Sequence, residues 1–229
     1  MYNIRNISSL FRNTFFLFIF TGILIALCYF WVDPAFSFWI ENENLRRFSI
    51  FEYFTHLVDA IIIWSFLYYC YFAWSFSKQR KKGIAARNSM FKWPCLNIAN
   101  SVSISIFIKD ILKLIFGRYW PRTFINNNPS LIHDHAYGFH WFHKGLSYQS
   151  FPSGHTAIGV AFMSSLFLLY PRSPWRWLGV LVACFIVIGL LANNYHFIGD
   201  CFSGGLLGAI VAYYVTEFSK NNNVFAIKQ

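Results

Sequence analysis

Residues 14–32 read TFFLFIFTGILIALCYFWV, a run of nineteen residues without a charged side chain. A helix needs about 20 mostly apolar residues to cross a hydrocarbon layer of roughly 30 Å, so this run predicts a membrane-spanning helix. The run is too long for the apolar region of a secretory signal peptide, and it lacks a small-residue cleavage site. We therefore expect this helix to be retained.

Five further apolar segments predict an all-α fold, an integral membrane bundle of six helices in a single domain, residues 1–229. The composition agrees, because 56% of the residues are hydrophobic and only 12% are charged, against about 25% charged in an average soluble domain. So few polar residues cannot cover a water-soluble core, and the apolar surface must face lipid. The third of the six segments carries three charged residues, and the fourth is short. The five further segments are 57–76, 96–116, 155–170, 177–193 and 199–218.

The net charge of +10 is distributed unevenly along the chain. A basic chain can bind nucleic acid, but in a membrane protein Lys and Arg accumulate on cytoplasmic loops. Twelve of the nineteen Lys and Arg residues fall on one side of the six-helix topology, whereas the connection 33–56 on the other side holds four acids. The twelve are Arg5, Arg12, Lys78, Arg80, Lys81, Lys82, Arg87, Lys92, Arg172, Arg176, Lys220 and Lys228.

This distribution predicts the orientation of the chain. We expect a multi-pass protein of a bacterial inner membrane, with both termini cytoplasmic and the segments 117–154 and 194–198 facing outward. We expect no nucleic-acid partner, because the basic residues are explained by the topology.

The outward segments and the helix ends beside them hold three clusters of polar residues. The first is KLIFGRYWPR at 113–122, the second is SFPSGHTA at 150–157, and the third is HFIGD at 196–200. A serine and a glycine at the start of a helix offer a hydroxyl and backbone N–H groups to an anion, unless the serine merely caps the helix. A histidine suits proton transfer, and an aspartate one helical turn after a histidine can hold its second ring nitrogen. These groups are the ones that phosphomonoester hydrolysis needs.

Together the three clusters resemble the type 2 phosphatidic acid phosphatase and vanadium haloperoxidase superfamily. Its pattern is Lys, six residues, Arg-Pro; then Pro-Ser-Gly-His; then Ser-Arg, five residues, His, three residues, Asp. The resemblance covers residues 109–208, and the six-helix layout is typical of the membrane branch of the superfamily. It implies that the site lies at the extracytoplasmic face and needs neither a cofactor nor a metal.

The resemblance also implies roles for individual residues. His196 would be the nucleophile that forms a phosphohistidine, Asp200 would orient and stabilise it, and His155 would protonate the leaving oxygen. A second set of residues would bind the phosphate. This substrate-binding set is Lys113, Arg118, Arg122, Ser153 and Gly154.

The chain departs from the pattern at both of its arginines. Trp120 stands where the first motif has arginine before proline, and Leu190 stands where the third motif has it. The position before a proline favours extended backbone, in which residues 118, 120 and 122 share a side. We therefore expect Arg118 or Arg122 to replace the first arginine.

Other polar residues allow more than one interpretation. Asn193 and Asn194 lie one helical turn beyond the missing third-motif arginine and are candidate neutral donors. Exposing the charges of Lys109 and Asp110 to lipid would be energetically unfavourable, so we expect the two residues to face the bundle interior as a structural ion pair. Asp59, early in the second apolar segment, either reaches the mouth of the cavity or caps its helix.

The His-rich stretch 133–144 superficially resembles a metal site, but aromatic residues with histidine are common at a membrane interface. We expect a lid or a headgroup-reading surface there. The five cysteines show no paired spacing, so we predict neither a disulfide nor a metal site from them. The last apolar segment contains Gly204, Gly205 and Gly208, which predict close helix packing.

The sequence therefore predicts a membrane phosphatase that acts on a lipid phosphate or diphosphate, of the phosphatidate, polyprenyl diphosphate or lipid A type. Three alternatives remain. A phosphotransferase would pass the same phosphoryl group to a lipid acceptor. A non-catalytic protein that binds or transports lipid phosphate is favoured by the missing arginines. A vanadate-dependent haloperoxidase fits least well, because those members resemble soluble helical proteins.

Overall fold

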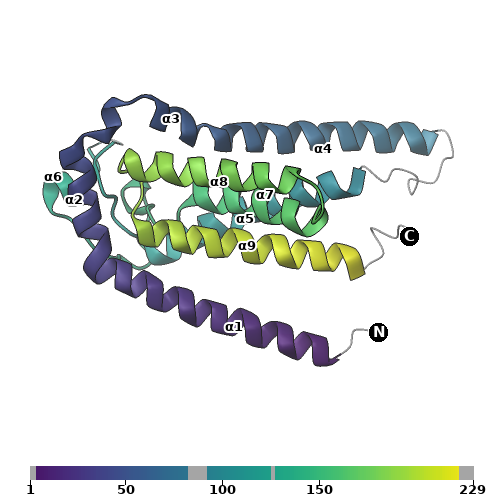
Figure 1. Ribbon diagram of the computed structural model, residues 1–229, viewed down its shortest axis with the longest axis horizontal. Helices are drawn as coiled ribbons and strands as arrows, with labels where there is room; N and C mark the ends of the chain where they lie inside the picture. The colour runs from purple at the N-terminus through teal and green to yellow at the C-terminus, as the bar shows by residue number, and fades with distance from the viewer. Residues whose placement is uncertain (1–3, 82–91, 125–126, 222–229) are drawn as a thin grey trace.

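The computed structural model describes residues 4–81, 92–124 and 127–221, and helices dominate these residues (Figure 1). Among them, β-structure is confined to isolated bridges, so the fold is all-helical as predicted. A π-helical turn at Cys28–Val32 joins the first two helices. The helices are α1 (Ile4–Leu27), α2 (Asp33–Glu43), α3 (Ile50–Thr55), α4 (Leu57–Lys81), α5 (Lys92–Phe116), α6 (Leu131–Asp134), α7 (Gly154–Leu169), α8 (Trp175–Ala192) and α9 (Ile198–Asn221).

The six predicted apolar segments fall, in order, in α1 with its π-helical turn, α4, α5, α7, α8 and α9. Four stretches are long and apolar enough to cross a membrane, and they fit a multi-pass membrane protein. Of the other two segments, α7 is apolar but shorter, and α5 carries the three charges noted above. The four stretches are Thr14–Glu43, Ile50–Gln79, Trp175–Ala192 and Ile198–Lys220. Of the basic residues used for orientation, Lys82, Arg87 and Lys228 lie outside the described residues.

The connection 33–56 is largely helical, because α2 and α3 occupy most of it. Asp33 and Pro34 form the start of α2, where the fixed φ and missing N–H of proline favour a helix. Asn44 ends α2 in the left-handed conformation, with φ of 49°. The apolar stretch that begins at Thr14 therefore continues through α2, and it brings Asp33 to the same end of the molecule as the three motifs.

The long helices run side by side, and α7 lies at the centre of the bundle (Figure 1). It packs against α5, α8 and α9, whereas α1 packs mainly against α9 and α4 mainly against α5. The start of α1 and the end of α9 lie at one end of the bundle, and α2, α3 and α6 are at the other. The starts of α7 and α9, which carry the second and third motifs, face the end with α2 and α6.

Two glycines let α9 approach α7 closely, as predicted. A Cβ atom on Gly204 would lie 2.3 Å from the carbonyl oxygen of Ser153, and one on Gly208 would lie 2.3 Å from that of Ala157. Without side chains at these positions, the two backbones pack directly against each other. Gly205 is different, because the nearest atom to its added Cβ is a methyl carbon at 3.9 Å.

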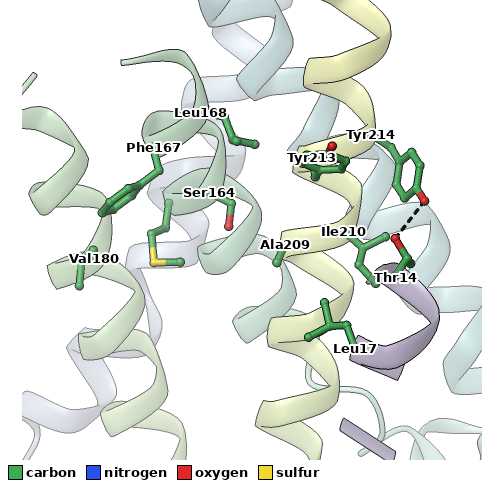
Figure 2. A pocket seen from close by; sticks show the side chains of 11 residues that line it. Thr14, Leu17, Ser164, Phe167, Leu168, Val180, Ala209, Ile210, Tyr213 and Tyr214 are labelled. Carbon is green, nitrogen blue, oxygen red and sulfur yellow. Dashed lines mark hydrogen bonds between the residues drawn. The ribbon is translucent and has the colours of Figure 1, made fainter. Parts of the chain in front are cut away.

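Two apolar cavities lie between the helices, and neither is lined by the predicted site residues. The cavity of about 600 Å³ in Figure 2 is bounded by α1, α7, α8 and α9. Ser164 and Tyr213 each contribute a hydroxyl group to this cavity. Thr14 and Tyr214 contribute two more, and the hydroxyl oxygens of these two residues are 3.2 Å apart. The second cavity, of about 670 Å³, is bounded by α4, α5, α7 and α8. The motifs lie at the end of the bundle and outside both cavities.

We predict that Gly208→Ala destabilises the protein and that Gly205→Ala does not. The new methyl group at position 208 would overlap a backbone oxygen, and overpacking of this kind typically costs about 1–3 kcal/mol. The melting temperature in detergent should fall for Gly208→Ala and stay within about 1 °C of the wild-type value for Gly205→Ala. Equal melting temperatures for the two variants would contradict this description of the α7–α9 contact.

Candidate active site

Ser153 precedes α7 and is completely buried. Its hydroxyl accepts a hydrogen bond from the backbone N–H of Thr156 at 3.4 Å, so the capping role considered for this serine is present. Its own backbone N–H donates to the carbonyl oxygen of Asp200 at 3.0 Å, which ties the start of α7 to α9. Gly154 and His155 form the first turn of α7, where backbone N–H groups carry partial positive charge.

His196 lies two residues before α9, and Asp200 lies in the first turn of that helix. Nδ1 of His196 is 3.5 Å from Oδ2 of Asp200, and only 4% of the His196 surface is exposed. The same carboxylate oxygen accepts hydrogen bonds from the hydroxyl of Ser150 at 2.5 Å and from the N–H of Phe197 at 3.1 Å. Because Nδ1 faces Asp200, Nε2 is the ring nitrogen that remains for chemistry. The ring of His155 lies nearby, with its centroid 6.5 Å from that of His196.

Arg118 is completely buried and bridges two carboxylates that are buried as well. Its Nη1 donates to Oδ1 of Asp200 at 2.6 Å, and its Nη2 donates to Oδ2 of Asp33 at 2.7 Å. Nη2 also donates to the hydroxyl of Tyr137 at 2.9 Å. We expected the guanidinium of Arg118 to be open to a phosphate. In the structure it instead donates to Asp200, Asp33 and Tyr137. Two buried carboxylates require a countercharge, which is the physical reason for this position.

Burial and charge act in opposite directions on the titratable groups here. Burial alone would lower the pKa of Arg118, but the carboxylates of Asp200 and Asp33 raise it above its ordinary value. Burial also lowers the pKa of His196, and Asp200 opposes this effect only in part. Arg118 therefore stays charged, and His196 is neutral near pH 7.

Trp120 and Lys113 stand beside the His196 ring. The ring centroids of Trp120 and His196 are 5.1 Å apart, and Nζ of Lys113 lies 5.4 Å from the centroid of the Trp120 ring. The indole N–H of Trp120 donates to the carbonyl oxygen of Leu146 at 2.8 Å, which fixes the ring. Trp120, the residue in place of the first arginine, therefore lies close to both Lys113 and His196.

The other expected replacements for the arginines are engaged with protein groups. Arg122 forms an ion pair with Glu41 at 2.9 Å. The side-chain amides of Asn193 and Asn194 donate to backbone carbonyl oxygens at 2.7 and 2.9 Å. Leu190 is 1% exposed and belongs to the hydrophobic core. At the place of the third-motif arginine, Leu190 is apolar, and the amide groups of nearby Asn193 and Asn194 already donate to the protein. These three residues therefore do not supply the positive charge of that arginine.

Asp33 is the site residue that the sequence interpretation missed. In the sequence Asp33 is one of the four acids of the connection 33–56. In the structure its carboxylate accepts a hydrogen bond from the guanidinium of Arg118 and another from the backbone N–H of Gly199 at 3.0 Å. The signal for this role is the position of Asp33 in the stretch Thr14–Glu43, which is long and apolar enough to span a membrane. An ionisable residue in such a stretch is expected to have a buried partner of opposite charge.

The remaining polar residues lie around this centre. Lys109 and Asp110 form the predicted ion pair at 2.5 Å, but the Asp110 side chain is 59% exposed and does not face the bundle interior. Asp59 pairs with His56 at 2.8 Å on the surface. In the His-rich stretch 133–144, His140 packs against tyrosine rings. Among the residues that the structure describes, no group of three or more His, Cys, Asp or Glu side chains could hold a metal ion.

A family model for the PAP2 superfamily matches residues 94–223, which include the three motifs. The chain belongs to the PAP2 superfamily. Over an alignment of 78 residues, the chain is also 36% identical to a lipid A 1-phosphatase of Porphyromonas gingivalis. This match covers 32% of the chain and 18% of that protein, so the chain spans well under two thirds of its length. No solved structure gives a significant match. Compared with the superfamily pattern, the sequence lacks both arginines and also the serine of the third motif, where Gly189 stands.

We predict that Arg118→Met strongly destabilises this PAP2 protein, because it leaves two buried carboxylates without a countercharge. Breaking a buried ion pair in this way costs about 3–5 kcal/mol. Arg122→Met is the matched control, since it removes a partly exposed pair that contributes about 0–1 kcal/mol. Denaturant titration in detergent measures both free energies of unfolding. Similar losses for the two variants would contradict a central role for Arg118.

Proposed function

We propose that this protein is a membrane lipid phosphatase that hydrolyses a lipid phosphate or diphosphate monoester through a phosphohistidine on His196. The observation that carries the proposal is the pairing of His196 with buried Asp200, opposite His155 and beside Lys113. Membership of the PAP2 superfamily and the partial likeness to a lipid A 1-phosphatase support it. The substrate class is phosphatidate, a polyprenyl diphosphate or a lipid A type lipid.

The proposed reaction has two steps. Nε2 of His196 attacks phosphorus, so a P–N bond forms while the P–O bond to the lipid breaks, and His155 gives its proton to the leaving oxygen. Asp200 stabilises the positive charge that develops on the His196 ring. Water, deprotonated by His155, then displaces the histidine and releases inorganic phosphate. No cofactor takes part in this scheme.

The phosphate-binding groups of the proposal are Lys113 and the first turn of α7. Lys113 would neutralise the phosphoryl charge, and the hydroxyl of Ser153 and the backbone N–H of Gly154 would bind its oxygens. Arg118 acts indirectly in this proposal, by holding Asp200, and Arg122 anchors α2 through Glu41.

We further propose that all six predicted segments span a bacterial inner membrane, that both termini are cytoplasmic and that the site opens outward, in one domain of residues 1–229. The positions of the basic residues support this orientation. The motif-bearing helix starts lie at the end of the bundle opposite the start of α1 and the end of α9 (Figure 1), which agrees with this orientation.

A second candidate is a non-catalytic protein that binds or transports lipid phosphate. The observation that favours it is the engagement of Arg118 and Arg122 with protein carboxylates, which leaves neither to bind phosphate as the superfamily arginines do. Such a protein would bind lipid phosphate without turnover. A phosphotransferase would instead produce a phosphorylated acceptor lipid from the same intermediate.

We predict that His196→Ala abolishes phosphate release. Purified protein is incubated with phosphatidate, undecaprenyl diphosphate or phosphorylated lipid A, and free phosphate and labelled lipid products are measured. Loss of a nucleophile typically lowers kcat by about 10⁴-fold or more. Equal release by wild type and His196→Ala would contradict the proposal, and binding without release by wild type would favour the non-catalytic candidate.

The lowered pKa of His196 predicts the position of the acid limb of the pH profile. The nucleophile must be neutral, and burial keeps it neutral as the pH falls below the ordinary histidine value of 6.5. The acid limb of kcat/KM should therefore lie below pH 6.5. Asp200→Asn removes the group that opposes the effect of burial, so it should move this limb to still lower pH. A limb at or above 6.5 in the wild type would contradict the assignment.

A further inference from the structure

Lys109 lies directly against the start of α7. A Cβ atom added to Gly154 would be 2.6 Å from Cδ of Lys109 and 3.7 Å from its Nζ. The side chain of Lys109 is only 18% exposed. Its aliphatic stem therefore crosses the glycine of the second motif, and its ammonium group reaches the turn that begins with Ser153.

Lys109 and Lys113 lie one turn apart on α5 and therefore share a face of the helix. Both charges act electrostatically on His155. Two ammonium groups and the positive end of α7 thus converge on one place, next to the two histidines. The carboxylate of Asp200 offsets this charge only in part, because it also accepts a hydrogen bond from Arg118.

The only carboxylate paired with Lys109 among the described residues is that of Asp110, at 2.5 Å. Consecutive helix residues point in different directions, so the long lysine side chain must turn aside from its own face to make this contact. Asp110 is 59% exposed, and an ion pair with an exposed carboxylate contributes little to stability. A phosphate dianion at the start of α7 offers Lys109 more negative charge than Asp110 does.

We propose that Lys109 is a second phosphate-binding lysine, which supplies the positive charge lost with the arginines at Trp120 and Leu190, and that Asp110 holds it while the site is empty. This inference rests on the proposed function and names a residue that the superfamily pattern does not contain. On substrate binding, the Lys109 ammonium group moves from Asp110 to a phosphoryl oxygen. A side chain at position 154 would meet the stem of Lys109, which would then have to shift.

The proposal predicts effects of opposite sign at two neighbouring positions. Lys109→Gln should weaken binding of inorganic phosphate about tenfold to a hundredfold, the usual effect of losing a hydrogen bond to a charged group. Asp110→Asn should strengthen phosphate binding, because it removes the competing carboxylate. Lys109→Arg should stay within about threefold of the wild type, since the charge is kept.

The measurement is calorimetric titration of the purified full-length variants in detergent with inorganic phosphate. The matched control is the pair Lys220 and Glu217, whose side chains are 3.0 Å apart on α9 at the other end of the bundle. Lys220→Gln and Glu217→Gln should leave phosphate binding unchanged. Melting temperatures identify any variant that is misfolded, and Lys109→Arg and Asp110→Asn still test the proposal if Lys109→Gln fails to fold.

The outcomes separate this inference from the proposed function. If the wild type binds phosphate but releases none from lipid, and the two variants shift binding in opposite directions, Lys109 binds phosphate and the hydrolytic function fails. If lipid hydrolysis occurs but Lys109→Gln and Asp110→Asn leave phosphate binding unchanged or shift it in the same direction, the pair is structural and the inference is overturned. Failure of the wild type to bind inorganic phosphate also overturns it.

Discussion

The buried ion network of Asp33, Arg118 and Asp200 is the interaction on which the rest of this structure depends. Buried charges are stable only when they are paired and hydrogen-bonded. Here one buried guanidinium forms ion pairs with two buried carboxylates. The three residues belong to the start of α2, the segment after α5 and the start of α9. Their pairing therefore joins parts of the chain that the apolar helix contacts alone do not bring into register.

The network also organises the groups proposed to react. The carboxylate of Asp200 faces His196, while its backbone carbonyl accepts a hydrogen bond from Ser153 at the start of α7. The backbone carbonyl of Arg118 accepts another from Ser150 at 3.1 Å. The histidine side and the helix-start side of the site are thus fixed to one frame. Such fixation is favourable for phosphoryl transfer, because donors that are already in position need no reorganisation when charge develops.

The helices determine how far the site lies from the end of the bundle. Lys109 is level with Gly154, and α5 continues from Lys109 for seven further residues to its end at Phe116, a distance of about 10 Å along the helix axis. The start of α7 is therefore recessed from the end of α5. Within this apolar helix Lys109 packs against Gly154, whereas the Asp110 side chain is 59% exposed, so the lysine and not the aspartate faces the candidate site.

The helical fold and the motif residues could be read directly from the sequence. Long apolar runs must become helices, because hydrocarbon offers no partner for backbone N–H and C=O groups. The spacing of His196 and Asp200 predicted that the two side chains lie close together, and they do, although His196 precedes α9. The role of Arg118 was decided only by the tertiary structure, since Asp33 lies 85 residues away in sequence. A buried charge takes the partner that is nearest in space, and that distance exists only once the helices have packed.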